Sequence, residues 1–400
     1  MTINPSRLAR LEAHLAEKYI AGGRLPCSLM LVARHGEMAH LGTQGFADIA
    51  RGVPLRDDHI FRIYSMTKPV TSVALMMLVE EGRIALDDPV AKFIPQWAGL
   101  EVHESGTLET GFKTRKPARA MQIIDLMRHT SGLTYGFQNR TPVDAAYRAL
   151  KLGEVATSGT LDTMIADLAR LPLEFSPGEA WNYSVSSDVL GWIIGQISGQ
   201  SFDSFLHDRI LAPLGMTDTG FHVPADKAHR LACCYQATPE GGFTLQDDAS
   251  TSPYLQPPAF VSGGGGLVST ASDYLRFARM ILNKGVFNGQ RLLSRKSVEL
   301  MSANHLPGGR CLPEMSRSLF SEASYEGVGF GLGFAVVKQP QRTLVPGSKG
   351  DLSWGGMAST FFWVDPQEDL IGIFMTQLIP SSTWPVRREV RTLTYAALDD

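Results

Sequence analysis

The chain has 400 residues, which is long enough for one large domain or for two lobes that share a core. Hydrophobic residues make up 44% of the sequence and charged residues 19%, a composition typical of a globular protein. Because the net charge is −3, from 37 basic and 40 acidic residues, the sequence lacks the basic excess of a nucleic-acid-binding protein, and we expect no nucleic-acid partner.

The first twenty residues predict an amphipathic helix. In this segment Leu8, Leu11, Leu15 and Tyr19 recur at three- and four-residue steps. Charged residues are spread through the segment, so it lacks the apolar centre of a signal peptide. No apolar run in the chain is long enough to span a membrane. We therefore expect a cytoplasmic protein with no membrane partner.

Strand-like segments lie towards both ends of the chain, and helix-like segments fill its middle. The apolar run 70–79 predicts a helix, since it follows Pro69 and stops before Gly82. Other helices are predicted at 121–128, 144–151, 161–168, 187–197, 202–210 and 271–282, and within 386–398. Strands are predicted at 28–33, 38–46, 331–337, 360–364 and 371–375, and the polar segment 105–118 predicts a surface loop.

This order of elements predicts one sheet built from both ends of the chain, flanked by helices, with an inserted helical lobe. We expect a single module over 1–400. In it, 1–85 and 325–400 form an α/β lobe, and 86–324 form a mainly helical lobe. A cleft between the two lobes is the natural place for a ligand.

The cysteines indicate neither a disulfide framework nor a metal site. Four of them, Cys27, Cys233, Cys234 and Cys311, are too few for a disulfide scaffold in a chain of this length. The sequence has no Cys-x-x-Cys pair and no His-Glu-x-x-His motif. We expect reduced cysteines that pack as small hydrophobic residues, and no metal.

The segment Ser65-Met66-Thr67-Lys68 opens the predicted helix at 70–79. Residues three apart in the first turn of a helix lie on one face, so the amine of Lys68 can reach the hydroxyl of Ser65. A neutral lysine can take the serine proton, and a charged one can stabilise the alkoxide. Taken alone, this spacing also fits a helix-cap serine and a surface lysine. Its position after an apolar run favours a nucleophile and its base.

Two further segments carry groups that suit acyl transfer. Tyr183 follows a Pro-Gly turn, and beside a charged lysine its phenolate is favoured, so that it could serve as a general base or relay. The segment Trp354-Gly355-Gly356-Met357 precedes a predicted strand, where glycines let a substrate approach the backbone and N–H groups can form an oxyanion hole. Each segment taken alone also fits a packing residue or an ordinary turn.

The order of these three segments resembles that of the penicillin-recognising serine enzymes. In those enzymes a Ser-x-x-Lys motif, a tyrosine motif and a glycine box near the C-terminus follow one another along the chain. Within the group, this sequence is similar to class C β-lactamases and most of all to family VIII carboxylesterases. Supporting segments are Leu126–Leu133, Phe175–Gly178, Gly264–Thr270 and Trp354–Pro366. The resemblance covers nearly the whole chain and implies the α/β (α+β) fold of β-lactamases and penicillin-binding-protein transpeptidases, with an antiparallel sheet.

Carried over residue by residue, the resemblance implies that Ser65 is the nucleophile and that Lys68 and Tyr183 form the proton-transfer pair. It also implies that the main-chain N–H groups of Ser65 and Met357 form the oxyanion hole and that the Trp354-Gly355-Gly356 box binds substrate. Neither a metal nor an organic cofactor is implied.

Two positions depart from the pattern of the β-lactamases. Val185 stands where they have the asparagine of Tyr-x-Asn, and Trp354 stands where they have lysine or histidine. Neither residue supplies the amide or the charge that holds a lactam side chain and carboxylate. The sequence therefore predicts a serine carboxylesterase for short-chain, neutral small-molecule esters, with Val185 in the substrate-binding wall. The shared acylation step also allows weak β-lactam hydrolysis.

Three alternatives of the same fold stay open. They are a D-amino-acid peptidase or amidase, an acyltransferase that uses an alcohol or amine in place of water, and an inactive ligand-binding protein. Binding alone does not need all three chemical segments, which argues against the last. An α/β-hydrolase is disfavoured, because the sequence contains no Gly-x-Ser-x-Gly elbow.

Overall fold

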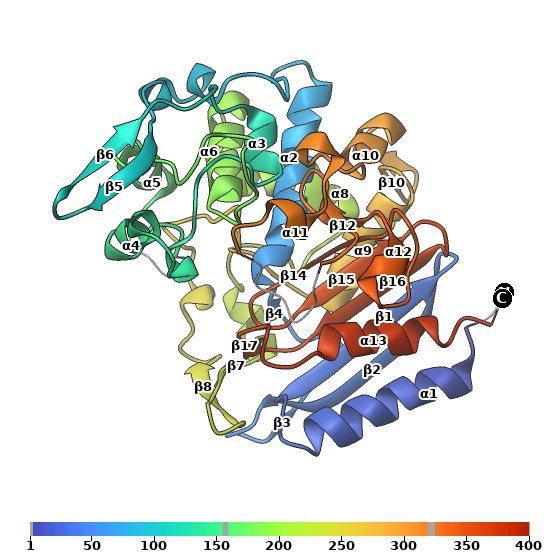
Figure 1. The fold of residues 1–400 in the computed structure, drawn as a ribbon. Helices are drawn as coiled ribbons and strands as arrows, with labels where there is room; N and C mark the ends of the chain where they lie inside the picture. The colour runs from blue at the N-terminus through green and yellow to red at the C-terminus, as the bar shows by residue number, and fades with distance from the viewer. Residues whose placement is uncertain (1–2, 155–158, 319–324, 400) are drawn as a thin grey trace.

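The computed structural model describes residues 3–154, 159–318 and 325–399. At the centre of these residues is an antiparallel sheet of eight strands in the order β12-β13-β14-β15-β16-β1-β2-β3 (Figure 1). Its strands are β1 (Cys27–Arg34), β2 (Glu37–Asp48), β3 (Val53–Pro54), β12 (Val328–Phe330), β13 (Ala335–Val337), β14 (Leu352–Gly355), β15 (Phe361–Asp365) and β16 (Leu370–Met375). The prediction of one sheet built from both ends of the chain is confirmed.

Helices cover both faces of the sheet. Alternate side chains of β1 enter two clusters: Leu29 lies in the larger core with α9 (Ala271–Leu282), whereas Met30 packs with α1 (Pro5–His14) and α13 (Val386–Tyr395). Successive side chains of a strand point to opposite faces, so a strand covered on both sides is buried at every position. This accounts for the continuous apolar character of the first predicted strand.

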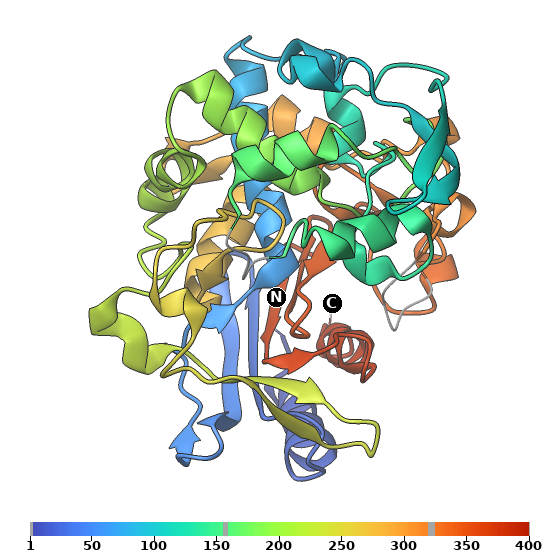
Figure 2. The ribbon, with the colours of Figure 1, turned by 90° about the vertical axis from the view of Figure 1, so that its left-hand side faces the viewer.

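The two ends of the chain lie together. Helices α1 and α13 pack side by side, as both views show (Figures 1 and 2). The amide of Asn4 donates to the carbonyl of Ala397 at 2.8 Å, while the side chain of Asn4 caps α1. Helix α1 continues as a π-helical turn over Leu15–Ile20, so the helix predicted for the first twenty residues is confirmed from Pro5 to Ile20. Residues 1–2 of that prediction lie outside the described ranges.

The region between β3 and β12 is mainly helical. Helix α2 (Thr67–Glu80) is buried along most of its length and packs against α6 (Ser186–Ser198) and α7 (Phe202–Leu206). The remaining helices are α3 (Ile123–Met127), α4 (Pro142–Ala149), α5 (Leu161–Leu168), α8 (Ala212–Leu214), α10 (Arg295–Met301) and α11 (Leu312–Met315), with α12 (Pro340–Thr343) after β13. Short strands pair as β4 (Phe61–Arg62) with β9 (Val268–Ser269), β7 (Cys234–Ala237) with β8 (Phe243–Asp247) and β17 (Leu378–Ile379), and β10 (Val286–Phe287) with β11 (Gln290–Arg291).

The surface loop predicted at 105–118 is wrong. The chain forms a hairpin of β5 (Val102–Thr107) and β6 (Gly111–Arg115) there. Gly106 and Gly111 have φ values of +85° and +84°, which glycine adopts without strain. Because most side chains of the hairpin are exposed or half-buried, its sequence lacks the apolar alternation that would reveal two strands.

Several other predictions from the sequence agree with the structure. The helices predicted at 161–168 and 271–282 have those bounds. The strand predicted at 331–337 is confirmed only over Ala335–Val337, which is β13, because 331–334 form the bend between β12 and β13. All four cysteines are buried and unbridged. Within the described ranges, no helix is long and apolar enough to cross a bilayer. The lobe boundaries at 85 and 325 stay a prediction.

Candidate active site

Ser65 lies at the junction between β4 and α2. A short 3₁₀ turn over Tyr64–Met66 connects the two elements. Tyr64 has a φ of +42°, a left-handed conformation that costs energy for a bulky residue. Its ring is buried in a small cluster with Cys234, Ala358 and Ile379, which holds the turn in place. Strain that the surrounding packing maintains in this way is typical of functional sites.

Lys68 lies in the first turn of α2, on the same side as Ser65, as its spacing from Ser65 predicts. Its Nζ donates to the Oγ of Ser65 at 3.1 Å and to the carbonyl of Gly264 at 2.6 Å. The side chain is fully buried, and burial lowers the pKa of Lys68 to about 7, against a small opposing effect of Asp188. Near neutral pH, a substantial share of this amine is therefore uncharged and able to accept a proton.

Tyr183 lies against both of these residues. The Nζ of Lys68 stands 4.4 Å from the centre of its ring, and its phenol is hydrogen-bonded to Ser65. The indole N–H of Trp354 donates to the Tyr183 oxygen at 3.2 Å. The structure thus brings together four of the residues predicted from sequence.

The prediction that the phenolate of Tyr183 is favoured is wrong. Burial raises the pKa of Tyr183, and the hydrogen bonds from Ser65 and Trp354 offset only part of that effect. The prediction assumed a fully charged lysine beside the ring, but burial also lowers the pKa of Lys68. Tyr183 is therefore a neutral phenol, suited to donating or relaying a proton.

The glycine box lies against the turn that carries Ser65. Trp354 and Gly355 belong to β14, and β13 pairs with this strand only at Leu352 and Ser353, so the box has an open edge. This edge matches the expectation that a substrate backbone could approach here. A Cβ on Gly356 would lie 2.4 Å from the carbonyl oxygen of Ile63, so only glycine allows this close approach.

Two main-chain N–H groups, those of Ser65 and Met357, are available to form the predicted oxyanion hole. Across the described ranges, neither the N–H of Ser65 nor that of Met357 donates to a backbone carbonyl. Met357 is 44% exposed, so this part of the box faces solvent. The two amides therefore fit the predicted oxyanion hole, and their role stays a prediction.

Val185 is fully buried at the start of α6, and its amide donates to the carbonyl of Thr134 at 3.2 Å. Its methyl groups lie so close to Gly153 that a Cβ there would approach Val185 to 2.5 Å. The position offers no polar group to a ligand, and its place in the substrate-binding wall stays a prediction.

Sequence reasoning missed Asp188. Its carboxylate accepts hydrogen bonds from the hydroxyl of Ser262 at 2.5 Å and from the amide of Gly264 at 2.9 Å, and burial raises its pKa. The carbonyl of the same Gly264 binds Lys68, so Asp188 supports the loop that positions the amine. A Cβ on Gly264 would lie 2.8 Å from both Asp188 and Tyr135, which explains a glycine at this position. An aspartate within the apolar segment 186–194 was the available signal.

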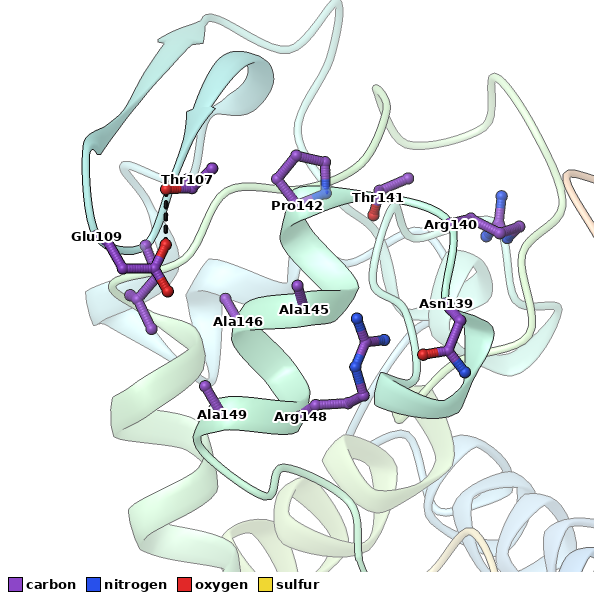
Figure 3. Close-up of a pocket in the computed structure, with 11 residues that line it drawn as sticks. Thr107, Glu109, Asn139, Arg140, Thr141, Pro142, Ala145, Ala146, Arg148 and Ala149 are labelled. Atoms are coloured by element: carbon purple, nitrogen blue, oxygen red, sulfur yellow. Dashed lines mark hydrogen bonds between the residues drawn. The ribbon is translucent and has the colours of Figure 1, made fainter.

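A separate cavity of about 310 Å³ lies between α4 and the tip of the β5–β6 hairpin (Figure 3). None of the predicted site residues lines it. Its two arginines are already paired, Arg148 with Asp144 at 2.7 Å and Arg140 with Glu174 at 3.3 Å. The cavity therefore offers no unpaired cation to an anionic ligand.

Comparison with known proteins defines the class to which this fold and site belong. The family model described as Beta-lactamase matches residues 9–396, and the chain belongs to this family. The family and fold predicted from the three segments are confirmed.

Particular relatives extend over nearly the whole chain. Protein Rv1367c of Mycobacterium tuberculosis is 39% identical over 364 residues, covering 90% of this chain and 87% of that protein. Esterase EstB of Burkholderia gladioli is 29% identical over 413 residues, covering 98% and 96%. The solved structure described as EstCE1, a hydrolase with promiscuous acyltransferase activity, superposes with a TM-score of 0.81 at 25% identity, covering 98% and 99%.

Proposed function

We propose that the protein is a serine carboxylesterase that hydrolyses small, short-chain esters through an acyl-enzyme on Ser65. One observation carries the proposal: a buried lysine with a pKa of about 7 lies 3.1 Å from the serine hydroxyl. An amine in that state is a base at neutral pH and activates a serine that is otherwise a weak nucleophile. The similarity to Esterase EstB and EstCE1 supports the same reaction class.

Acylation follows from these positions. The Oγ of Ser65 attacks the ester carbonyl carbon as its proton passes to the Nζ of Lys68. The N–H groups of Ser65 and Met357 bind the oxyanion of the tetrahedral intermediate. The carbon–oxygen bond to the alcohol then breaks, and Lys68 returns the proton to the leaving alcohol through the neutral phenol of Tyr183.

Deacylation reverses these roles. A water molecule gives one proton to the Lys68–Tyr183 pair and attacks the acyl carbon. The bond from that carbon to Ser65 breaks, Ser65 regains its proton, and the free acid leaves. Since Lys68 and Tyr183 share the proton, they titrate as a coupled pair.

The walls of the site favour a neutral substrate. Trp354 uses its only polar hydrogen on Tyr183, and Val185 is apolar and buried. Neither can bind the carboxylate of a β-lactam. The proposal is therefore hydrolysis of neutral esters, with β-lactams as poor substrates of the same acylation step.

Acyl transfer to an alcohol is the second candidate. EstCE1 is described as a hydrolase with promiscuous acyltransferase activity, and an acyl-enzyme reacts with whichever nucleophile reaches it. Adding a small alcohol to an ester assay and measuring the ratio of new ester to free acid separates the two. A ratio above the molar ratio of alcohol to water would show that the acyl-enzyme prefers the alcohol, and a ratio above one would make transfer the main activity.

A substrate panel tests the proposed function. It contains short and long nitrophenyl esters, nitrocefin and a D-alanyl amide, each assayed with the parent protein and with Ser65→Ala. We expect the fastest turnover on short esters and none with the variant. Faster turnover of nitrocefin would identify a β-lactamase, faster turnover of the amide a peptidase, and no turnover of any substrate a binding protein. The cytoplasmic location stays a prediction.

A further inference from the structure

Arg387 places a buried positive charge beside the glycine box. It lies in the first turn of α13, and its Nη2 donates to the carbonyl of Gly356 at 2.5 Å and to the carbonyl of Thr360 at 2.9 Å. Its guanidinium carbon lies 5.7 Å from the centre of the Phe361 ring. A Cβ on Gly355 would come within 2.6 Å of that carbon, so glycine is needed there to admit the guanidinium.

This charge has no carboxylate partner. In the described part of the chain, no acidic side chain lies within ion-pair distance of Arg387, and its buried Nε has no hydrogen-bond partner. Arg391, one turn further along α13, is bonded to the carboxylate of Asp351. Burying a cation without a counter-charge is costly, so structural stability alone does not account for Arg387.

The Gly356 carbonyl, which accepts the hydrogen bond from Arg387, belongs to the Gly356–Met357 peptide unit. The oxygen of Gly356 and the N–H of Met357 are the two ends of one planar amide. A cation at the oxygen draws electron density from the nitrogen, which makes the N–H a stronger donor. The second bond of Arg387, to Thr360, fixes the same turn, because the Thr360 carbonyl also accepts from the amide of Gly356 at 2.9 Å.

We propose that Arg387 is a positioning residue that orients and polarises the Gly356–Met357 peptide as an oxyanion donor. This inference rests on the proposed function. As negative charge develops on the substrate oxygen, the N–H of this polarised peptide binds that oxygen more strongly. Arg387 itself does not touch the substrate.

Three substitutions separate this role from a structural one. Arg387→Lys keeps a charged donor, and Arg387→Gln keeps a donor without the charge. Arg388→Gln is the matched control, since Arg388 is exposed on the same helix and, within the described part of the chain, its side chain bonds only the carbonyl of Leu344. Thermal unfolding shows which variants are folded, and only those are compared.

The measurements report how strongly the protein stabilises the oxyanion. We expect kcat for a short nitrophenyl ester to fall about tenfold in Arg387→Gln, less in Arg387→Lys and not in Arg388→Gln, with KM within about threefold throughout. The affinity of an alkyl boronic acid, which forms a tetrahedral adduct, should fall by the same factor as kcat. The infrared stretch of the acyl-enzyme carbonyl should move to higher frequency in Arg387→Gln.

Each outcome bears on the proposal. Unchanged kcat, boronate affinity and carbonyl frequency in Arg387→Gln would overturn it while leaving ester hydrolysis by Ser65 intact. An equal loss in the lysine and glutamine variants would also overturn it, because the charge would then have no role. If Arg387→Gln does not fold, the carbonyl frequency of the acyl-enzyme in Arg387→Lys decides. A small shift to higher frequency supports the proposal, and an unchanged frequency overturns it. A parent protein without ester hydrolysis would instead reject the proposed function itself.

Discussion

Two fully buried cations stand six residues apart on either side of Ser65, in β4 and in the first turn of α2. Arg62 binds the carboxylate of Asp247 at 2.6 Å, the carbonyl of Ala232 at 2.6 Å and the hydroxyl of Ser252 at 3.0 Å. Among the described residues, Lys68 donates only to the neutral oxygens of Ser65 and Gly264. Both side chains are almost completely removed from solvent.

The difference between the two regions separates stability from chemistry. At Arg62, the carboxylate of Asp247 supplies a counter-charge in direct contact and ties β4 to β8. At Lys68 no carboxylate makes such contact, and burial, which outweighs the opposing effect of Asp188, lowers the pKa of Lys68 to about 7. Burial of Lys68 without a carboxylate in contact therefore lowers the stability of the fold more than burial of the paired Arg62 does. It also makes Lys68 a base at neutral pH.

Substitution of Lys68 should have the largest effect on activity and should not lower stability. Lys68→Met fills the same space without an amine, so the acylation rate should fall by roughly 10²- to 10⁴-fold. Because the variant no longer buries an ionisable amine, its free energy of unfolding at pH 7 should be equal or higher. Stopped-flow acylation and urea unfolding measure the two effects. A stable variant that retains more than a tenth of the rate would remove Lys68 as the base.

Substitution of Arg62 should do the reverse. Arg62→Met leaves Asp247 without its partner in a largely buried position, which should lower the free energy of unfolding by about 3 kcal/mol. Where the variant is folded, Ser65 and Lys68 remain in place, and kcat should stay within a few-fold of the parent value. Urea unfolding and an ester assay at low temperature check both parts. A loss of activity without a loss of stability would break the comparison.

The pH profile tests the state of Lys68 in the parent protein. Below a pKa of about 7 the amine is protonated and cannot accept the proton of Ser65. The acylation rate should therefore fall about tenfold for each pH unit below that value, and should level off above it. A limb centred near pH 10, the range of an exposed lysine, would show that burial does not lower this pKa.

The smallest effect is expected at Trp354. Trp354→Phe keeps an aromatic ring beside Tyr183 but removes the N–H that donates to the phenol oxygen. A hydrogen bond of this kind contributes about 1 kcal/mol, so kcat should fall about fivefold. The Trp97→Phe variant, whose indole donates to Ile165 away from the site, is the control and should leave kcat unchanged. Equal effects of the two substitutions would assign Trp354 a packing role only.

Some of the site can be read from the sequence because it depends on local geometry. The three-residue spacing of Ser65 and Lys68 is enough to place them on one helix face, and the structure has them in contact. The neighbourhood of Tyr183 and the glycine box could be predicted only through the order shared with a known family. Local spacing contains no information about contacts across more than a hundred residues.

What could not be predicted depends on burial and long-range packing. The direction of the Tyr183 pKa shift follows from its loss of solvent, which no motif reveals. Asp188 supports Lys68 through Gly264, 76 residues away, and Arg387 meets the box only because α13 lies against β14 and β15. The β5–β6 hairpin was missed because most of its side chains are exposed or half-buried, so its sequence has no clear apolar alternation.

The central claim is that Ser65 becomes acylated with Lys68 as its base. Mixing the protein with a short nitrophenyl ester, quenching with acid within milliseconds and mapping the peptides by mass spectrometry tests it most directly. The account predicts one acyl group on Ser65, none in Ser65→Ala and slow accumulation in Lys68→Met. An acyl group on another residue, or the same yield of adduct in Ser65→Ala, would contradict it.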